Sequence, residues 1–182
     1  MLRLILIFTL FATALTAYAA NTRIVIKTSE GDILVELFDD KAPRSVENIL
    51  DLVDNDFYDG LIFHRVIANF VVQGGGYDEK LIYRTPPRSV VNESANGLKN
   101  TRGTLALARA EDPDSADSQF FFNVNDNEHL DRSPSNAGYT VFGRVLTGMK
   151  VVSMIELSDT HVAQGMAGVP ERAITILSVE RY

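Results

Sequence analysis

The sequence predicts one mainly β domain, a sandwich or a barrel, that carries two short helices. Seven or eight short stretches rich in β-branched and aromatic residues follow one another along the chain, separated by turn residues. Only two segments show the spacing of apolar residues that is typical of a helix. The chain has 182 residues, of which 46% are hydrophobic and 23% charged, a composition typical of a single globular domain.

Residues 1–19 are expected to form a signal peptide that is removed from the mature protein. A short basic start ends at Arg3, an apolar stretch without charge follows, and Ala17-Tyr18-Ala19 matches the small-x-small cleavage pattern. The alternative is a short membrane anchor, since the uncharged stretch approaches the roughly 20 apolar residues that a spanning helix needs. The cleavage pattern favours removal. We therefore expect one domain over residues 20–182, secreted and without stable membrane insertion after cleavage.

The domain is expected to begin with a β-hairpin followed by a helix. Residues 22–27 and 33–38 alternate in polarity, and the turn cluster between them contains Gly31. Pro43 suits a first helical turn, where its missing N–H costs nothing. After it, apolar residues recur with the i, i+3, i+4, i+7 spacing of one helical face up to Val53.

The remaining elements follow from the same criteria. The predicted strands are 61–66, 70–73, 104–109, 119–124, 140–146 and 173–179, and the second helix is 148–157. Residues 77–103 form a long stretch rich in Pro, Asn and Gly, and such a loop is usually functional or contains local structure of its own. Periodicity alone leaves the choice between a sandwich and a barrel open.

Composition excludes several classes of function. No cysteine is present, which excludes disulfides, cysteine-ligated zinc and thiol chemistry. The three histidines, His64, His129 and His161, are far apart in the sequence and offer little for a metal site. The net charge of −7, without a run of basic residues, argues against nucleic-acid binding. The common hydrolase, phosphate-loop and zinc-protease motifs are absent, so no cofactor or metal is expected.

Three strand segments carry unusual residues. Arg65 is expected to share a strand face with Phe63 and Ile67, residues 105–110 have small side chains, and three phenylalanines follow Gln119. The simpler interpretations are a structural salt bridge for the arginine and core packing for the phenylalanines. Together, however, these residues would form an apolar pocket with a few polar groups, which is how ligand sites are built.

An ordered set of motifs across the chain closely resembles the cyclophilins, a family of peptidyl-prolyl cis-trans isomerases. The matching segments are Phe63-His64-Arg65, Phe70, Gln73-Gly74-Gly75, Asn100-Thr101-Arg102-Gly103, Ala108-Arg109, Ser118-Gln119-Phe120-Phe121 and Val141-Phe142-Gly143. Each is weak alone, whereas the ordered set, from about Arg23 to Val179, is very specific. Asn92-Glu93 and Asn96-Gly97-Leu98 resemble the bacterial secreted branch. The resemblance implies a closed eight-stranded antiparallel β-barrel capped by two α-helices, and a periplasmic location.

The resemblance also assigns roles to residues. Arg65 matches the catalytic arginine. The implied substrate-binding residues are Phe70, Val71, Gln73, Ala108, Arg109, Ala110, Gln119, Phe121, His129, Leu130 and Tyr139. This chain departs from common family residues at several of them. Val71 replaces a methionine, Arg109 an asparagine, His129 a tryptophan or phenylalanine, and Tyr139 a histidine.

The function implied by the resemblance is rotation about X-Pro peptide bonds that assists folding of envelope proteins. The expected partners are proline-containing polypeptides and unfolded envelope proteins, and a monomer without cofactors is expected. A proline-peptide-binding module or holdase chaperone that uses the same groove without turnover is the main alternative. A lipocalin-like carrier is a third alternative, but it would need a large empty lumen, and the interior is expected to be filled by Phe, Ile, Leu and Val. Arg65 discriminates the first two, because a pure binder needs no cation on the pocket wall.

Overall fold

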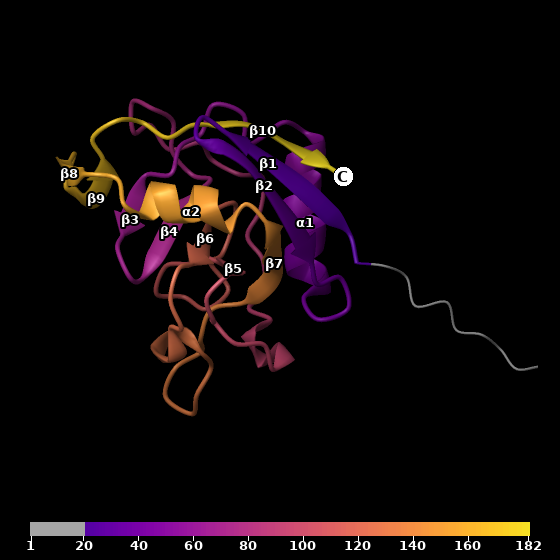
Figure 1. Cartoon of the computed structure of the whole chain (residues 1–182). Helices are drawn as coiled ribbons and strands as arrows, with labels where there is room; N and C mark the ends of the chain where they lie inside the picture. The colour runs from indigo at the N-terminus through magenta and orange to yellow at the C-terminus, as the bar shows by residue number, and fades with distance from the viewer. Residues whose placement is uncertain (1–20) are drawn as a thin grey trace, which may run out of the picture.

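The computed structural model describes residues 21–182, and the expected leader at 1–19 lies outside the described residues (Figure 1). The strands are β1 Arg23–Thr28, β2 Gly31–Leu37, β3 Arg65–Ile67, β4 Val71–Gly74, β5 Thr104–Leu107, β6 Phe120–Asn123, β7 Val141–Thr147, β8 Thr160–Ala163, β9 Met166–Pro170 and β10 Ile176–Arg181. The α-helices are α1 Pro43–Asp54 and α2 Met149–Glu156, and two 3-10 helices are η1 Ser94–Asn96 and η2 Glu128–Leu130. No helix in residues 21–182 has the length and apolar character needed to cross a membrane.

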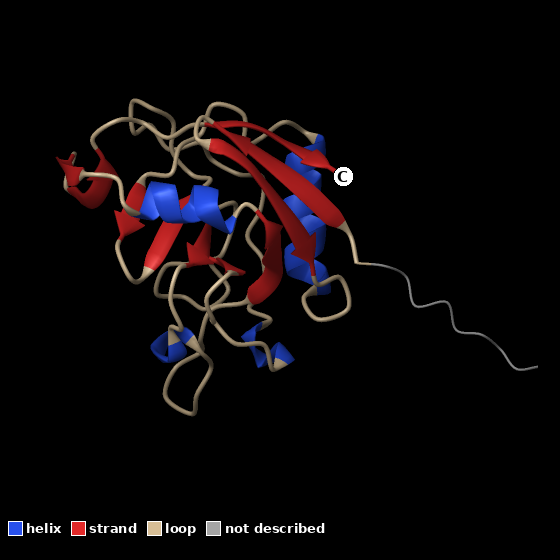
Figure 2. Ribbon diagram, in the orientation of Figure 1, coloured by secondary structure: helices blue, strands red, loops and turns tan. Residues whose placement is uncertain are grey.

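Eight strands form one curled antiparallel sheet in the order β10-β1-β2-β7-β5-β6-β4-β3 (Figure 2). The prediction of a mainly β domain with two helices is confirmed. The first hairpin pairs β1 with β2, with Ile24 opposite Val35 and Ile26 opposite Ile33. All four of these side chains are buried, so the alternation in the sequence correctly identifies the inner face of this hairpin.

The prediction of a closed barrel is wrong. The sheet ends at β3 on one side and β10 on the other, and no ladder joins these two edges. The isolated bridge between Ile62 and Thr175 crosses the gap instead, with hydrogen bonds from Phe63 N to Ile174 O (3.0 Å), from Ile176 N to Leu61 O (2.7 Å) and from Gly60 N to Ile176 O (2.9 Å). The physical reason is the shortness of β3. Its ladder with β4 begins only at Arg65, after the chain has left the segment that faces the C-terminal residues.

Several element boundaries differ from the predictions. Helix α1 begins at Pro43 as predicted, whereas residues 61–64 precede the short strand β3 instead of forming its first half. The β8–β9 hairpin was not predicted. Most of β8 is exposed, so burial imposes no alternation of apolar and polar residues that would mark it in the sequence. The long loop contains local structure, the 3-10 helix η1.

The long loop is fastened to α1 through Glu93. Its carboxylate accepts hydrogen bonds from Arg44 N (3.1 Å), Ser45 N (2.8 Å) and Ser45 Oγ (2.7 Å) at the start of the helix. Ala42, the residue that precedes the helix, provides no side-chain cap. An acceptor from a distant segment therefore satisfies N–H groups that have no partner within the helix, and its negative charge is favourable at this end.

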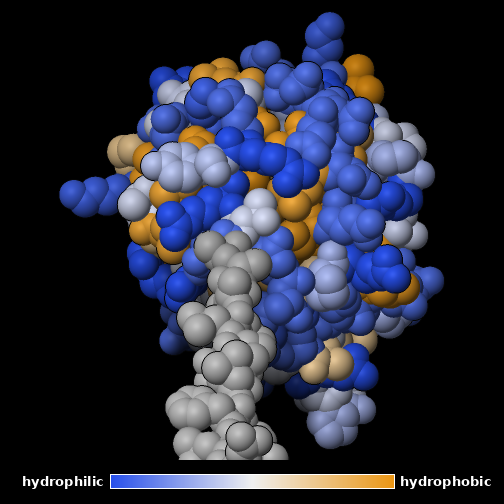
Figure 3. Space-filling model, turned by 90° about the vertical axis from the view of Figure 1, so that its right-hand side faces the viewer, coloured by the Kyte–Doolittle hydropathy of each residue, from blue (hydrophilic) through white to orange (hydrophobic). Residues whose placement is uncertain are grey.

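Buried apolar residues form two separate clusters. The larger one fills the space between the curled sheet and the helices and contains Phe63, Phe120 and Phe122. The smaller one lies on the other face of β4, β5 and β6, and its buried members are Val71, Ala106, Phe121, Leu130 and Val141. Hydrophilic residues predominate on the outer face shown in Figure 3, with hydrophobic residues between them. Three members of the smaller cluster, Val71, Phe121 and Leu130, also line a surface pocket.

Candidate active site

Nine of the twelve site residues predicted from the sequence line one pocket of about 320 Å³. Its lining consists of Arg65, Phe70, Val71, Gln73, Ala108, Arg109, Phe121, Leu130 and Tyr139. Two further predicted residues, Ala110 and Gln119, line an adjoining cavity of about 360 Å³ that shares Gln73, Ala108 and Arg109 with the first. The remaining predicted residue, His129, is exposed and stacks on Phe70, with 5.3 Å between the ring centroids and 26° between the planes.

Strand register places the central side chains in one row. Arg65 of β3 lies opposite Gln73 of β4, Gln73 lies opposite Phe121 of β6, and Phe121 lies opposite Ala106 of β5. Directly paired residues of neighbouring strands point to the same face of a sheet. The small Ala106 leaves room above the sheet, so the row forms a floor with a cation at one end and an aromatic ring in the middle.

The expected alternation around Arg65 is only partly correct. Phe63 is fully buried in the larger cluster with Phe120 and Phe122, whereas Arg65 lines the pocket on the opposite side of the sheet. Residues 63 and 64 lie outside the β3–β4 ladder, so the two-residue period does not extend back to Phe63. The alternation of the three phenylalanines is confirmed: Phe120 and Phe122 enter the larger cluster and Phe121 enters the smaller one.

Arg65 is a half-buried cation, and no carboxylate of residues 21–182 lies within salt-bridge distance of it. Its Nη1 donates a long hydrogen bond to Gln73 Oε1 (3.4 Å), and Gln73 Nε2 donates to Gln119 Oε1 (3.1 Å). The guanidinium carbon lies 5.8 Å from the centre of the Phe70 ring. Burial lowers the pKa of Arg65 below its ordinary value, but a guanidinium remains charged at neutral pH. The interpretation of Arg65 as a member of a structural salt bridge is therefore wrong, and N–H donors of its guanidinium remain available to a ligand.

Arg109, in contrast, is held by backbone carbonyl groups at the rim. Its Nε donates to Gly138 O (3.0 Å), and its Nη1 donates to Ala110 O (2.8 Å) and Glu111 O (3.2 Å). The guanidinium carbon lies 4.6 Å from the centre of the Tyr139 ring. These contacts make Arg109 a fixed part of the pocket wall, since several of its donors already have acceptors.

Aromatic and aliphatic side chains form the other walls. Phe121 is 4% exposed and contacts the Tyr139 ring edge to face, at 5.7 Å between centroids. Val71 and Leu130 are buried beneath the pocket, whereas Phe70 is half-buried at its mouth. An apolar pocket with one cation and a few amides binds a compact apolar group and places a strong donor beside it.

Sequence reasoning missed the far side of the adjoining cavity. Tyr77, Tyr83, Ser115 and Asp117 line it together with predicted residues. Tyr83 Oη donates to Asp117 Oδ2 (2.5 Å), which joins the long loop to the segment before β6. No pattern in the sequence marks this pair, because 34 residues separate them and neither lies in a strand of the sheet.

The described chain, residues 21–182, contains no cluster of three His, Cys, Asp or Glu side chains that could hold a metal ion. The polar side chains that line the pocket are those of Arg65, Gln73, Arg109 and Tyr139, and its other walls are apolar.

Comparisons with known proteins agree on one family. The family described as Cyclophilin type peptidyl-prolyl cis-trans isomerase/CLD matches residues 23–181. Peptidyl-prolyl cis-trans isomerase from Acinetobacter baylyi is 48% identical over 161 residues, which cover 88% of this chain and 86% of that protein. Peptidyl-prolyl cis-trans isomerase B from Escherichia coli is 45% identical over 163 residues, 86% of this chain and 97% of that protein.

A solved structure shows the same fold. The cyclophilin type peptidyl-prolyl cis-trans isomerase of Cryptosporidium parvum, crystallised in the presence of the dipeptide Ala-Pro, is 26% identical, with a TM-score of 0.73 over 88% of this chain and 98% of that one. The family match covers nearly all described residues, and both bacterial relatives are isomerases of similar length. This chain therefore belongs to the cyclophilin-type peptidyl-prolyl cis-trans isomerases.

Proposed function

We propose that Arg65 is the catalytic residue of this isomerase and that the 320 Å³ pocket holds the proline ring of the substrate. The observation that carries the proposal is a cation without a salt-bridge partner, among residues 21–182, on the wall of an otherwise apolar pocket. Such a cation costs desolvation free energy and makes no compensating ion pair. Its place in the pocket is accounted for by what it does to a bound peptide.

The physics of the amide explains why one donor is enough. Resonance holds the peptide bond planar behind a barrier of about 18–20 kcal/mol, and X-Pro bonds exchange between isomers over tens to hundreds of seconds. In the transition state the amide is twisted and its nitrogen regains a lone pair. A hydrogen bond from the Arg65 guanidinium to that nitrogen stabilises the twisted form more than the planar one, and only such differential binding accelerates the reaction.

The walls contribute by fixing the ring and excluding water. Phe70, Phe121 and Leu130 line the pocket and contact the ring in this proposal, which leaves the rest of the peptide free to rotate. The removal of water strengthens the interaction of Arg65 with the nitrogen, because fewer solvent dipoles screen it. No nucleophile, proton relay or cofactor takes part in the proposed reaction.

The test compares Arg65→Ala with Arg65→Lys in an NMR exchange assay on an Ala-Pro peptide. Arg65→Ala is expected to lower kcat/KM by roughly 10²–10³, the effect typical of losing one transition-state donor. Arg65→Lys keeps the charge but not the rigid fork of donors, so partial activity is expected. Exposed Arg44 provides the control, because Arg44→Ala removes an arginine that does not line the pocket. Full turnover by folded Arg65→Ala would refute the assignment, and peptide binding without turnover by the wild type would favour the binding module.

We also propose that the protein acts in the periplasm, as a monomer, on unfolded envelope proteins that contain proline. The sequence of residues 1–19 supports this location, since a basic start, an apolar stretch and an Ala-x-Ala site are typical of an exported protein. Mass spectrometry of the protein from a periplasmic extract is expected to give an N-terminus at or near Ala20. An intact Met1 in membrane-bound mature protein would contradict the proposal.

A further inference from the structure

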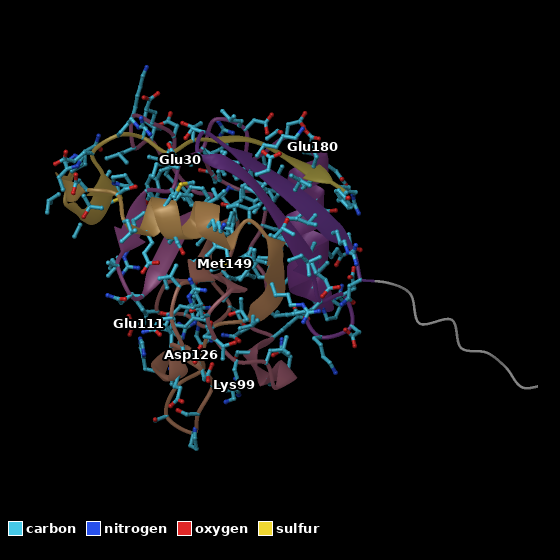
Figure 4. All side chains as sticks on the ribbon, viewed as in Figure 1. Glu30, Lys99, Glu111, Asp126, Met149 and Glu180 are labelled. Atoms are coloured by element: carbon cyan, nitrogen blue, oxygen red, sulfur yellow. The ribbon has the colours of Figure 1, made fainter. Side chains whose placement is uncertain are left out.

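Three asparagine side chains lie buried behind the pocket, although none of them lines it. Asn100, Asn123 and Asn127 are 2%, 0% and 3% exposed, and they come from the end of the long loop, from β6 and from the residue before η2. Lys99 and Asp126, which adjoin two of them in sequence, lie at the same end of the molecule (Figure 4). A buried amide is costly unless it is hydrogen-bonded, so the partners of these side chains indicate their role.

The amides are joined in a fixed order that starts at a pocket wall. Asn127 Nδ2 donates to the backbone O of Phe70 (2.9 Å) and to Asn123 Oδ1 (2.8 Å). Asn123 Nδ2 donates in turn to Asn100 Oδ1 (3.2 Å) and to Thr104 Oγ1 (3.0 Å). Each of these amide groups therefore uses both of its hydrogens, and each accepting amide oxygen orients the next side chain.

The series ends at the facing wall. Asn100 Nδ2 donates to the backbone O of Leu130 (3.2 Å), which also accepts a hydrogen bond from Tyr139 N (3.0 Å). The same asparagine is fixed by Asp131, whose Oδ1 accepts from Asn100 N (2.8 Å) and Nδ2 (3.1 Å). Lys99 Nζ lies 3.4 Å from the other carboxylate oxygen of Asp131. The last amide is thus held at both its backbone and its side chain.

We propose that Asn100, Asn123 and Asn127, which we call the asparagine relay, set the separation between Phe70 and Leu130 and so position the two walls that grip the proline ring. The inference rests on the proposed function, because it takes this pocket as the proline site. No hydrogen bond among the described residues joins the relay to Arg65, whose side chain bonds to Gln73. The asparagines are therefore positioning residues that act on substrate binding, while the hydrogen bond to the twisted amide comes from Arg65.

This division of roles has a measurable signature. A fully satisfied buried network is rigid, and loss of its central member frees both ends at once. In Asn123→Ala, KM for an Ala-Pro peptide is expected to rise roughly tenfold with kcat changed by at most about twofold, since walls that grip the proline ring bind the ground state and the transition state alike. Asn127→Ala is expected to show the same split. Because the asparagines act as one unit, the double variant should raise KM no further than either single variant does.

Asn48 provides the matched control. It is 1% exposed and its Nδ2 also donates to a backbone oxygen, that of Asp117 (2.7 Å), while its Oδ1 accepts from Arg88 Nε (3.1 Å). Asn48→Ala is expected to lower the melting temperature as a buried amide loss does and to leave KM unchanged. If the relay only stabilised the fold, Asn123→Ala, Asn127→Ala and Asn48→Ala would show the same changes in melting temperature and in KM.

The outcomes separate this inference from the proposed function. Unchanged KM in folded Asn123→Ala and Asn127→Ala, or an equal rise of KM in Asn48→Ala, would overturn the relay. If Asn127→Ala does not fold, Asn123→Ala decides alone, since its side chain bonds to neither wall directly. If Asn123→Ala is also unfolded, the milder Asn123→Ser takes its place, judged by the same KM-to-kcat split. If Arg65→Ala retains turnover, the proposed function is refuted. If Arg65→Ala loses turnover but KM is unchanged in the asparagine variants, only the relay is refuted.

Discussion

His64 makes the stability of this protein sensitive to acid. It is 4% exposed, its Nδ1 has no hydrogen-bond partner among the described residues, and its ring lies 4.6 Å from that of Tyr77. Burial, the largest cause, and the positive charge of neighbouring Arg65 together lower the pKa of His64 from 6.5 to about 4, against the opposing effect of hydrogen bonds. The folded protein therefore holds this side chain as a neutral imidazole at neutral pH.

The sign and size of the effect follow from proton linkage. Because the pKa of His64 is lower in the folded than in the unfolded state, the unfolded chain binds the proton first as the pH falls. The stabilisation is complete above pH 6.5, decreases below it, and is lost by about pH 4. A pKa difference of about 2.5 corresponds to roughly 3 kcal/mol in the free energy of unfolding, at 1.36 kcal/mol for each pKa unit.

The assay is urea unfolding followed by far-ultraviolet circular dichroism at pH 7 and pH 4, for the wild type and His64→Phe. Phenylalanine keeps a ring beside Tyr77 but does not titrate, so the stability gap between the two proteins is expected to change by roughly 3 kcal/mol in favour of the variant. Carboxylates contribute equally to both proteins and cancel. Exposed His161 provides the control, because His161→Phe should follow the wild type. Parallel loss of stability in wild type and His64→Phe would refute the reasoning.

Two further predictions concern the pocket walls. Phe121→Ala is expected to lower the free energy of unfolding by about 3–5 kcal/mol, because the ring is 4% exposed, and also to weaken binding of an Ala-Pro peptide in an NMR titration; unchanged stability would contradict the burial argument. Many cyclophilins contact the cyclic peptide cyclosporin through an indole ring, and the resemblance places His129 at the position of that ring. His129 is exposed and stacks on Phe70. Inhibition curves should therefore show weak inhibition of the wild type and a gain in His129→Trp; tight inhibition of the wild type, or no gain in the variant, would show that this position does not control the drug site.

Local patterns in the sequence were enough to predict most elements. Helix α1 has the apolar spacing that buries Val46, Ile49 and Val53, and this spacing depends only on the helical period. The first hairpin is defined in the same way by its alternation of buried and exposed positions. The ordered motifs also identified the residues that converge on the pocket, although they lie on the three strands β3, β4 and β6, on the 3-10 helix η2 and on three loops.

Properties that depend on contacts between distant segments could not be read in this way. The simpler interpretation of Arg65, a structural salt bridge, and the closed barrel implied by the resemblance are both wrong, and the hairpin at 160–170 had no signal in the sequence. The burial of His64 and the bonds of the asparagine relay also had no signal in the sequence, because a histidine or asparagine has the same local propensity in either environment.

Local patterns in the sequence predicted the type and order of most elements, because periods of two and 3.6 residues are local properties of the backbone. The ordered motifs predicted the family and the residues that line the pocket. Tertiary contacts, in contrast, set where the sheet stays open, which cation lacks a carboxylate among the described residues, and which buried amides support the walls. Burial and hydrogen-bond partners are set by the register between segments that lie tens of residues apart, and that register exists only once the chain has folded.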